Sequence, residues 1–432
     1  MSSSSGGLLK TSTPVTAGGW LALAAALLGW MAAGMEMALM VPTARPAIQF
    51  FLGANTAGIE ILADQWLSWF VAAFLLGAAL GGLVFGWLGD RWGRVRALAG
   101  SVLCFALFTG FGYWAQSPEQ LLILRFFACL GIGGTWPNGV ALVGETLPQL
   151  SRPWVAGLIG ASANVGFLIL GFLMLGHPIT KDSWRWVMLV GAVPLLLSVF
   201  IGVAVPESPE WLRRQKVRPR GVDEPPAPAP AIWRPPLLRL TVLGILLGTI
   251  PLLGGWASGQ RLVPWAGQVA ERAGLPDLKA ATQTSLALGA VIGSLIGGWV
   301  ASRIGKQWSF FAISGLSLLL SLITYLRFQP TDPLFNLMVL ALGCVSTMYY
   351  GWLPYFLPQI FPTSIRATGI GVSFNFGRIL SAAAVLGSTG LSHWFGGDIA
   401  KMGAVLSLIY AGGLVLAFLI PEPPEAIESL AD

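Results

Sequence analysis

The most informative chemistry in this sequence lies in a few ionisable side chains that interrupt long apolar stretches. Glu36, Asp64, Arg125 and Arg378 each stand among apolar neighbours. A charged group costs about 2.5–3.5 kcal/mol or more in the middle of a bilayer, so each of them is a functional candidate by default. A carboxyl in a low-dielectric environment favours its neutral form, which suits a group that binds and releases protons. A guanidinium stays charged and binds a carboxylate through two parallel hydrogen bonds.

These properties give the acids and the arginines different expected roles. We expect Glu36 and Asp64 to couple to protons, and Glu36 is the better candidate because it lies inside its apolar run. We expect Arg378 to bind an anion. The alternative is structural, because Arg378 could form an ion pair with Glu36 that only holds two helices together. Arg125 could do the same with Glu145, and from the sequence alone these alternatives stay open.

Neutral polar and aromatic side chains in the apolar runs could bind a solute. Each could equally hold helices together or pack at the membrane interface. The candidates for hydrogen bonding are Asn138, Asn164, Gln260, Gln283, Tyr349, Tyr350 and Asn375, and those for stacking are Trp136 and Trp256.

The composition places these residues in a membrane protein. Of 432 residues, 55% are apolar and 10% are charged, and the mean hydropathy is +0.73, which excludes an ordinary globular protein. The first apolar run is too long for the core of a cleaved signal peptide, about 7–15 residues, so we expect it to be retained. Runs long enough to cross a bilayer as a helix predict twelve spans, at 18–41, 64–89, 95–115, 119–144, 154–176, 185–205, 237–259, 281–302, 307–328, 333–357, 367–391 and 399–420.

A segment rich in Pro and Arg, residues 206–236, separates six spans from the other six. Its composition predicts a solvated connector, with one six-helix bundle in residues 1–205 and a second in residues 237–432. An even number of spans puts both termini and this linker on one side. That side carries fifteen Lys and Arg residues and the other carries eight, so the positive-inside rule predicts cytoplasmic termini.

The two halves contain a repeated segment. Residues 77–94 align without gaps to residues 289–306, at an offset of 212, and share glycines, a Trp and an Arg. A second pairing, at an offset of 214, relates Glu145-x-x-Pro148-x-x-x-Arg152 to Gln359-x-x-Pro362-x-x-x-Arg366. Parallel repeats of this kind place a binding site between the two copies.

The repeated glycines predict where helices approach closely. Gly77 and Gly81, with their copies Gly289 and Gly293, present small faces on the second and eighth spans. Such faces suit helices that slide as well as helices that pack statically.

The loop after the second span reads Gly86-Trp87-Leu88-Gly89-Asp90-Arg91-Trp92-Gly93-Arg94 and suits a cytoplasmic lock. Gly86 should permit close helix approach and Gly93 a tight turn, while Asp90 can accept from basic side chains or a helix N-terminus. Because Ser302 replaces the acid in the second copy, we expect the stronger lock in the N-terminal half. A generic positively charged loop is the alternative. The expected gate residues are Gly86, Asp90, Arg91, Gly93, Arg94, Glu145, Arg152, Arg303 and Arg366.

The sequence resembles the major facilitator superfamily over essentially the whole chain. Besides the loop at 86–94, the resemblance rests on Arg125 with Gly131, Gly133 and Gly134, on Glu145 to Arg152, on Pro206-Glu207-Ser208-Pro209-Glu210-Trp211-Leu212, and on Phe361 to Gly369. It implies an all-α membrane protein with the major facilitator fold, twelve transmembrane helices in two six-helix bundles. The sugar-porter and metabolite:proton-symporter branches are the most similar.

Two departures from these branches refine the expectation. Sugar porters carry a Gln-Gln pair in the seventh span, where this chain has Ile250-Pro251-Leu252-Leu253-Gly254-Gly255-Trp256, which argues against sugar recognition. Related carriers often have two acids in the first span, whereas Ala32 and Ala33 leave Glu36 alone. The stretch from Phe361 to Arg378 resembles bacterial carriers of lactate-like, sialate-like or aromatic carboxylates.

The expected function is therefore secondary active transport by alternating access, with a small organic acid taken up together with protons. Proton-coupled export of drugs or metabolites and sugar transport are the alternatives, and a membrane sensor without transport is a remote one. His177 and His393 are isolated, and no phosphate loop, zinc set or nucleophilic triad is recognisable. We expect no enzyme activity, no metal, no cofactor and no nucleic acid, and a monomer that functions in the bacterial inner membrane.

Overall fold

The computed structural model describes residues 16–147, 153–217, 233, 235, 237–357, 360, 366–387 and 389–421. Within these ranges the chain forms helices and no strand. The N-terminal half contains α1 (Ala17–Leu52), α2 (Ile59–Trp92), α3 (Arg94–Phe111), a 3-10 turn (Gly112–Trp114), α4 (Pro118–Thr146), α5 (Pro153–Gly176), and the consecutive α6 (Trp186–Ala192) and α7 (Pro194–Ala204), which together make one span. The short helix α8 (Pro209–Val217) follows.

The C-terminal half begins with a long, irregular span, Leu237–Ala273. The next spans are separate helices, and the last consists of two. The irregular span comprises α9 (Leu237–Leu253), a π-helical turn (Gly254–Ser258), a 3-10 turn (Gly259–Arg261) and α10 (Leu262–Ala273). The helices that follow are α11 (Leu278–Ile304), α12 (Lys306–Arg327), α13 (Phe335–Phe356), α14 (Arg366–Gly387), the short α15 (Thr389–Trp394), and the pair α16 (Ile399–Ser407) and α17 (Ile409–Ala417).

The predicted fold class is confirmed. Within the described ranges, eleven helical spans are long and apolar enough to cross a membrane. The 22-residue helix α14, which carries Asn375 and Arg378, completes the twelve. The molecule is an all-α membrane protein whose twelve transmembrane helices form two six-helix bundles, as in the major facilitator fold.

The predicted ends of the first and seventh spans are wrong. The helix α1 runs to Leu52 instead of ending near Val41, and it contains Pro42 and Pro46. A proline inside a helix leaves the carbonyl four residues earlier without its usual donor. Here the ammonium of Lys279 donates to the carbonyl of Pro42, so a contact from the other half replaces the lost hydrogen bond.

The longer first and seventh spans, and the earlier start of the eighth at Leu278, move three basic residues out of the predicted loops. Arg45 lies in α1, Arg261 in the seventh span and Lys279 in the first turn of α11. Arg261 is buried and Lys279 is half-buried. Their new positions matter for the contacts between the two halves.

The repeated glycines pack helices together inside each half, as predicted. A Cβ atom on Gly81 would lie 1.9 Å from the carbonyl oxygen of Leu130 in α4, and one on Gly293 would lie 1.9 Å from that of Cys344 in α13. These pairs, α2 with α4 and α11 with α13, belong to a single half, so the contact is static packing rather than sliding between halves. The expected close approach at Gly86 is wrong, because a Cβ there would meet nothing within 4 Å.

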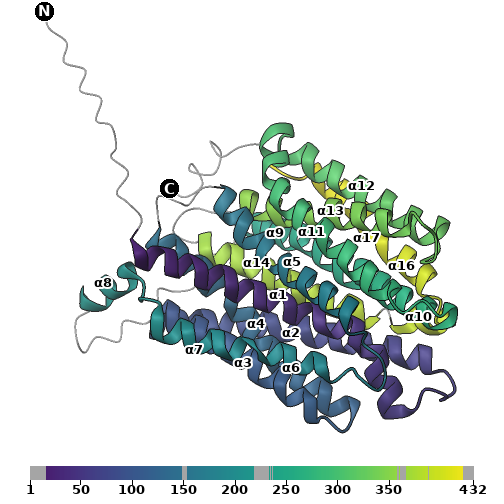
Figure 1. The fold of residues 1–432 in the computed structure, drawn as a ribbon. Coiled ribbons are helices and arrows are strands. Elements are labelled where there is room, and N and C mark those ends of the chain that lie inside the picture. The colour runs from purple at the N-terminus through teal and green to yellow at the C-terminus, as the bar shows by residue number, and fades with distance from the viewer. Residues whose placement is uncertain are drawn as a thin grey trace, which may run out of the picture.

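The two halves lie side by side and meet along α2 with α14 and along α5 with α11. Figure 1 shows α8 at one end of the molecule and α10 at the opposite end. We call these the α8 end and the α10 end.

Candidate functional site

Arg378 is a buried cation where the halves meet. Its Nη1 donates to the carbonyl oxygen of Ala78 in α2 at 3.2 Å and lies 3.5 Å from Oδ1 of Asn375, one turn earlier in α14. Its guanidinium carbon lies 5.1 Å from the centre of the Phe374 ring. Nε has no hydrogen-bond partner, and no described carboxylate forms an ion pair with this arginine. The guanidinium therefore still has a donor that can bind an anion.

Other predicted polar residues also have unused hydrogen-bonding capacity. The side chain of Gln283 in α11 is fully buried, and neither of its amide atoms has a partner; Oε1 of Gln260 also lacks one. Tyr350 in α13 lies close enough to Arg378 for an electrostatic interaction. Buried polar atoms without partners are uncommon in native structures, so these groups are suited to a polar solute.

Glu36 and Arg125 form an ion pair inside the N-terminal half. Nη1 of Arg125 in α4 lies 2.6 Å from Oε1 of Glu36 in α1, and it also donates to the Glu36 carbonyl oxygen at 3.0 Å. The side chains are 4% and 1% exposed. The pairing of Arg125 with Glu145 is therefore wrong. Both lie in α4, twenty residues and about 30 Å apart along the helix axis.

A small void lies beside this ion pair. Its volume is about 10 Å³, and Oε2 of Glu36 and Oγ1 of Thr109, which line it, have no hydrogen-bond partner. Gly191 makes room for the carboxylate, since a Cβ there would lie 3.0 Å from Oε2 and 2.4 Å from the Thr109 methyl carbon. A buried water needs roughly 10–15 Å³ and several polar partners, so the void has about the size of one water.

Asp64 forms the second buried ion pair, and this one joins the two halves. Its carboxylate contacts the guanidinium of Arg261 in the irregular seventh span. The same guanidinium donates to Oγ of Ser68 at 3.3 Å and, through Nε, to the carbonyl oxygen of Ala257 at 2.8 Å. The sequence analysis missed Arg261 as a partner because it placed this residue in an outer loop.

More polar contacts between the halves lie nearby at the α10 end. Arg45 binds Glu60 of its own half through two hydrogen bonds, 3.0 and 2.6 Å long, and binds Glu271 of the other half at 2.7 Å. Gln268 of α10 donates to Glu60 at 2.9 Å. Together with Asp64 and Arg261, these contacts join the two halves at the α10 end.

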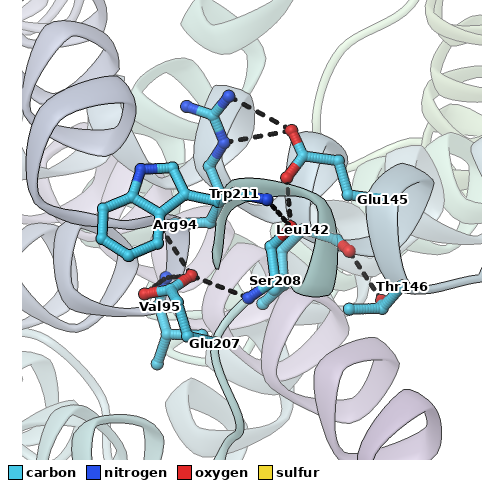
Figure 2. Close-up of polar contacts among 8 residues, drawn as sticks. All are labelled: Arg94, Val95, Leu142, Glu145, Thr146, Glu207, Ser208 and Trp211. Atoms are coloured by element: carbon cyan, nitrogen blue, oxygen red, sulfur yellow. Dashed lines mark hydrogen bonds and ion pairs between the residues drawn. The ribbon is translucent and has the colours of Figure 1, made fainter. Parts of the chain in front are cut away.

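The predicted gate residues Arg94 and Glu145 meet at the α8 end. Figure 2 shows the guanidinium of Arg94 bound to Oε1 of Glu145, with Nε at 3.2 Å and Nη2 at 3.1 Å, while Oε2 of Glu145 accepts from the hydroxyl of Ser208. Glu207 accepts from the backbone N–H groups of Arg94 at 2.9 Å and Val95 at 3.1 Å. A carboxylate at the start of α3 is favoured by the helix dipole. Arg94 and Glu145 belong to the N-terminal bundle, and Glu207 and Ser208 directly follow it, so the contacts hold α3, α4 and the start of α8 together without involving the C-terminal half.

Gly93 is required at this corner for two reasons. Its φ of +115° is a conformation that other residues rarely adopt. A Cβ there would also lie 2.2 Å from Oε2 of Glu207. The tight turn predicted at Gly93 is therefore present, and Glu207 was the partner that the sequence analysis did not assign.

The repeated arginines of the gate behave alike in both copies. The guanidinium of Arg91 lies 5.2 Å from the ring centre of Trp87, and that of Arg303 lies 5.4 Å from that of Trp299. Ser302, which replaces the acid, donates to a carbonyl of its own helix at 2.7 Å. Arg152 and the side chains of Asp90 and Arg366 lie outside the described part of the structure.

Three predicted solute-binding residues make packing contacts within one half. Asn138 donates to the carbonyl oxygens of Phe85 and Gly134 at 2.9 and 2.8 Å. The hydroxyl of Tyr349 lies 2.6 Å from Oγ of Ser314. Trp136 packs against Trp30 with ring centres 5.0 Å apart. The hydrogen-bonding or stacking groups of these residues therefore already have partners within their own half.

Two other candidates join the halves. Asn164 in α5 donates to Oγ of Ser294 in α11 at 2.7 Å. Trp256, in the π-helical turn, packs between Phe74 of α2 and Phe167 of α5, with ring centres 4.4 and 6.3 Å apart. An aromatic cluster from both halves therefore lies in the interface.

Two parallel six-helix halves with buried ionisable groups at their interface form the architecture of a secondary transporter. The sequence model of the Major Facilitator Superfamily matches residues 19–385. The chain belongs to this superfamily and is a transporter rather than an enzyme.

Relatives and solved structures represent both expected branches. A putative metabolite transport protein of Haemophilus influenzae is 29% identical over 418 residues, which cover 94% of this chain and 96% of that protein. The cis,cis-muconate transport protein of Acinetobacter baylyi is 29% identical, with 72% and 74% covered. The xylose transporter XylE from E. coli, in a partially occluded inward-open conformation, superposes with a TM-score of 0.68 at 17% identity, with 92% and 98% covered. The XylE likeness concerns the fold.

Proposed function

We propose that this transporter takes up a small organic acid, a monocarboxylate or an aromatic carboxylate, together with protons and by alternating access. The observation that carries the proposal is the buried guanidinium of Arg378 between the halves, which has no carboxylate partner among the described residues. A buried charge without a counterion is costly, so an anionic solute would stabilise it. Relatives that are named as transporters of muconate, gentisate, 4-hydroxybenzoate and benzoate agree with this class.

The substrate carboxylate would bind Arg378 through two parallel hydrogen bonds. Nη1 binds the carbonyl of Ala78 and Nε has no partner, so a carboxylate would bind the edge of the guanidinium that includes Nε. Phe374 and Tyr350, which both lie near Arg378, would then contact the rest of the solute.

Glu36 and Asp64 would carry the proton coupling. Protonation of Glu36 would remove the countercharge of Arg125 inside the N-terminal half, and the void beside Oε2 could hold the water that delivers the proton. Protonation of Asp64 would weaken its contact with Arg261, which joins the halves at the α10 end. The α10 end would then open while the α8 end closes.

The orientation follows from the basic residues of the loops. The α8 end carries the linker side of the molecule, and the excess of Lys and Arg predicted for that side supports a cytoplasmic position by the positive-inside rule. Both termini would then be cytoplasmic, and the α10 end would face the exterior of a bacterial inner membrane. A monomer that binds only solute, protons and lipid suffices for this cycle.

The test is uptake of radiolabelled 4-hydroxybenzoate into proteoliposomes with an inward proton gradient. Arg378→Met should abolish uptake and counterflow, whereas Arg327→Met, at the exposed end of α12, should leave both unchanged. Glu36→Gln should abolish uphill uptake and leave counterflow. Uptake that ignores the pH gradient, or that survives in Arg378→Met, would refute the proposal. Parallel assays with xylose and a cationic drug test the sugar-porter and exporter alternatives.

A further inference from the structure

A cavity with a lysine in its lining lies between the halves at the α10 end. Its volume is about 310 Å³, at the lower limit of small-molecule sites, about 300–1,000 Å³. The cavity is lined by α1, the end of α5 and the segment after it from the N-terminal half, and by α10 and α11 from the C-terminal half; Arg378 is not among its lining residues. Its apolar wall is formed by Val41, Pro42, Met174, Ile179, Pro264 and Leu275.

Lys279 supplies the cation of this cavity. Its Nζ donates to the carbonyl oxygens of Pro42 and, at 3.4 Å, of Ile179, which both belong to the other half. The first carbonyl is available because Pro46, four residues later in α1, has no N–H to donate. Among the described residues, no carboxylate lies within ion-pair distance of this ammonium.

The two other charged residues that line the cavity, Arg45 and Glu271, cancel each other. Arg45 and Glu271 both line it and bind each other at 2.7 Å. Arg45 also binds Glu60. Lys279 and Ala280, in the first turn of α11, line the cavity too, and the first-turn N–H groups of a helix lack partners within the helix and carry partial positive charge. Among the charged residues that line the cavity, Lys279 is the one whose ammonium binds only carbonyl oxygens. The site therefore offers one ammonium to a single carboxylate, while the carboxylate of Glu271, whose side chain is 56% exposed, disfavours a second negative charge.

We propose that this cavity binds a small aromatic monocarboxylate at a site separate from the one at Arg378. The ligand class follows the proposed function, whereas the site rests on the cavity and Lys279 alone. The carboxylate would bind the Lys279 ammonium, and the ring would lie against the apolar wall. Because the ligand would contact both halves, its binding stabilises the closed α10 end, so the external acid regulates the transporter at this end before it is carried.

The experiment is equilibrium dialysis of radiolabelled benzoate against the purified full chain in lipid nanodiscs. The wild type should bind two molecules. Lys279→Met and Arg378→Met should each bind one, and the control Lys401→Met, which removes an exposed lysine paired with Asp398 at 3.1 Å, should bind two. Terephthalate, a dianion, should compete at least tenfold more weakly than benzoate at the site that Arg378→Met retains.

A second variant guards against misfolding of Lys279→Met. A Cβ on Gly267 would lie 3.1 Å from Cδ of Lys279, so Gly267→Leu fills the cavity and keeps the ammonium. It should weaken this site at least tenfold, and Lys279→Arg should retain it.

The outcomes separate the two proposals. We call the proposed site at Lys279 the outer site. It is overturned if Lys279→Met and Gly267→Leu both still bind two molecules of benzoate. It is also overturned if the wild type binds one molecule and only Arg378→Met abolishes that binding. Loss of one site in Lys279→Met, with no loss in Arg378→Met, supports the outer site and refutes the proposed central one.

Discussion

Breaking the ion pair between Glu36 and Arg125 should cost far more than breaking an exposed pair. The two groups lie 2.6 Å apart and are 1% and 4% exposed, so water cannot replace the lost partner. Unit charges about 4 Å apart attract by about 4 kcal/mol at an effective dielectric constant near 20. Removal of one partner from a buried pair typically costs about 3–5 kcal/mol, so the two estimates agree. We expect Arg125→Met to lose about that much stability.

The double variant Glu36→Met with Arg125→Met gives the sharper result. Replacement of a whole buried pair by apolar residues is often neutral or stabilising, so the double variant should be more stable than Arg125→Met alone. The resulting coupling energy should be at least about 2 kcal/mol. Reversible unfolding of the purified protein in mixed SDS micelles measures all four proteins of the cycle. The exposed pair of Lys401 with Asp398 is the control, and its coupling should be below about 1 kcal/mol.

The same proteins separate a structural pair from a proton site. The double variant should fold and should not accumulate 4-hydroxybenzoate against its gradient, because no titratable carboxyl remains at residue 36. A stable double variant that still performs uphill uptake would refute the proton role of Glu36. Single variants that lose less than about 1 kcal/mol would refute the argument from burial.

Three further predictions concern packing, capping and the gate. Gly81→Val should prevent assembly of the N-terminal half, because a Cβ at residue 81 would lie 1.9 Å from a carbonyl oxygen of α4. Gly86→Val should be tolerated, since a Cβ at residue 86 would meet nothing within 4 Å. Size-exclusion chromatography of the two purified variants compares their folding. Glu207→Ala removes the acceptor at the start of α3 and should cost about 1–3 kcal/mol, seen in thermal melts. Asp64→Asn weakens the contact with Arg261 and should speed labelling of Ser68→Cys by an impermeant thiol reagent in a cysteine-free background.

Each of these predictions has a result that contradicts it. Equal yields of monodisperse Gly81→Val and Gly86→Val would contradict the packing of α2 against α4. An unchanged melt for Glu207→Ala would mean that the N–H groups of α3 find water instead. If Ser68→Cys is labelled equally slowly with and without Asp64→Asn, the ion pair of Asp64 with Arg261 does not hold the α10 end closed.

The number of helices and their division into halves were predictable because a bilayer imposes its length on every span. The C-terminal end of α1 was harder to predict. Hydropathy stops at Pro42 and Arg45 because a proline and a charge rarely continue a span, yet α1 continues to Leu52. The compensation comes from Lys279 and Glu271 in the other half, and contacts over such separations leave no local signal.

The candidate site was predictable in its residue types and not in its pairings. An acid or an arginine in an apolar run is conspicuous, so Glu36 and Arg378 were found. Which charges meet depends on the rotation of each helix about its axis, which the spacing did not provide. Helix length could have corrected one choice, since Arg125 and Glu145 are too far apart along α4 to form a pair.

The two buried acids differ in what a movement of the halves does to them. Glu36 and Arg125 both belong to the N-terminal half, so the proposed rocking would leave their contact intact. The contact of Asp64 with Arg261 joins the halves and would have to break if the α10 end opens. A proton on Glu36 can therefore influence opening only through an element that also touches the other half. The helix α1 is such an element.

Six residues beyond Glu36, about 9 Å along the helix axis, the carbonyl of Pro42 binds Lys279, and three residues later Arg45 binds Glu271. A shift of α1 that follows loss of the countercharge on Arg125 would disturb both contacts at once. Coupling through α1 requires Pro46, because a residue with an N–H at this position would bind the Pro42 carbonyl within the helix and release Lys279. Pro46→Ala should therefore keep the fold and the counterflow activity but lose uphill uptake driven by the proton gradient. If Pro46→Ala accumulates the solute to the same ratio as the wild type, coupling through α1 is excluded.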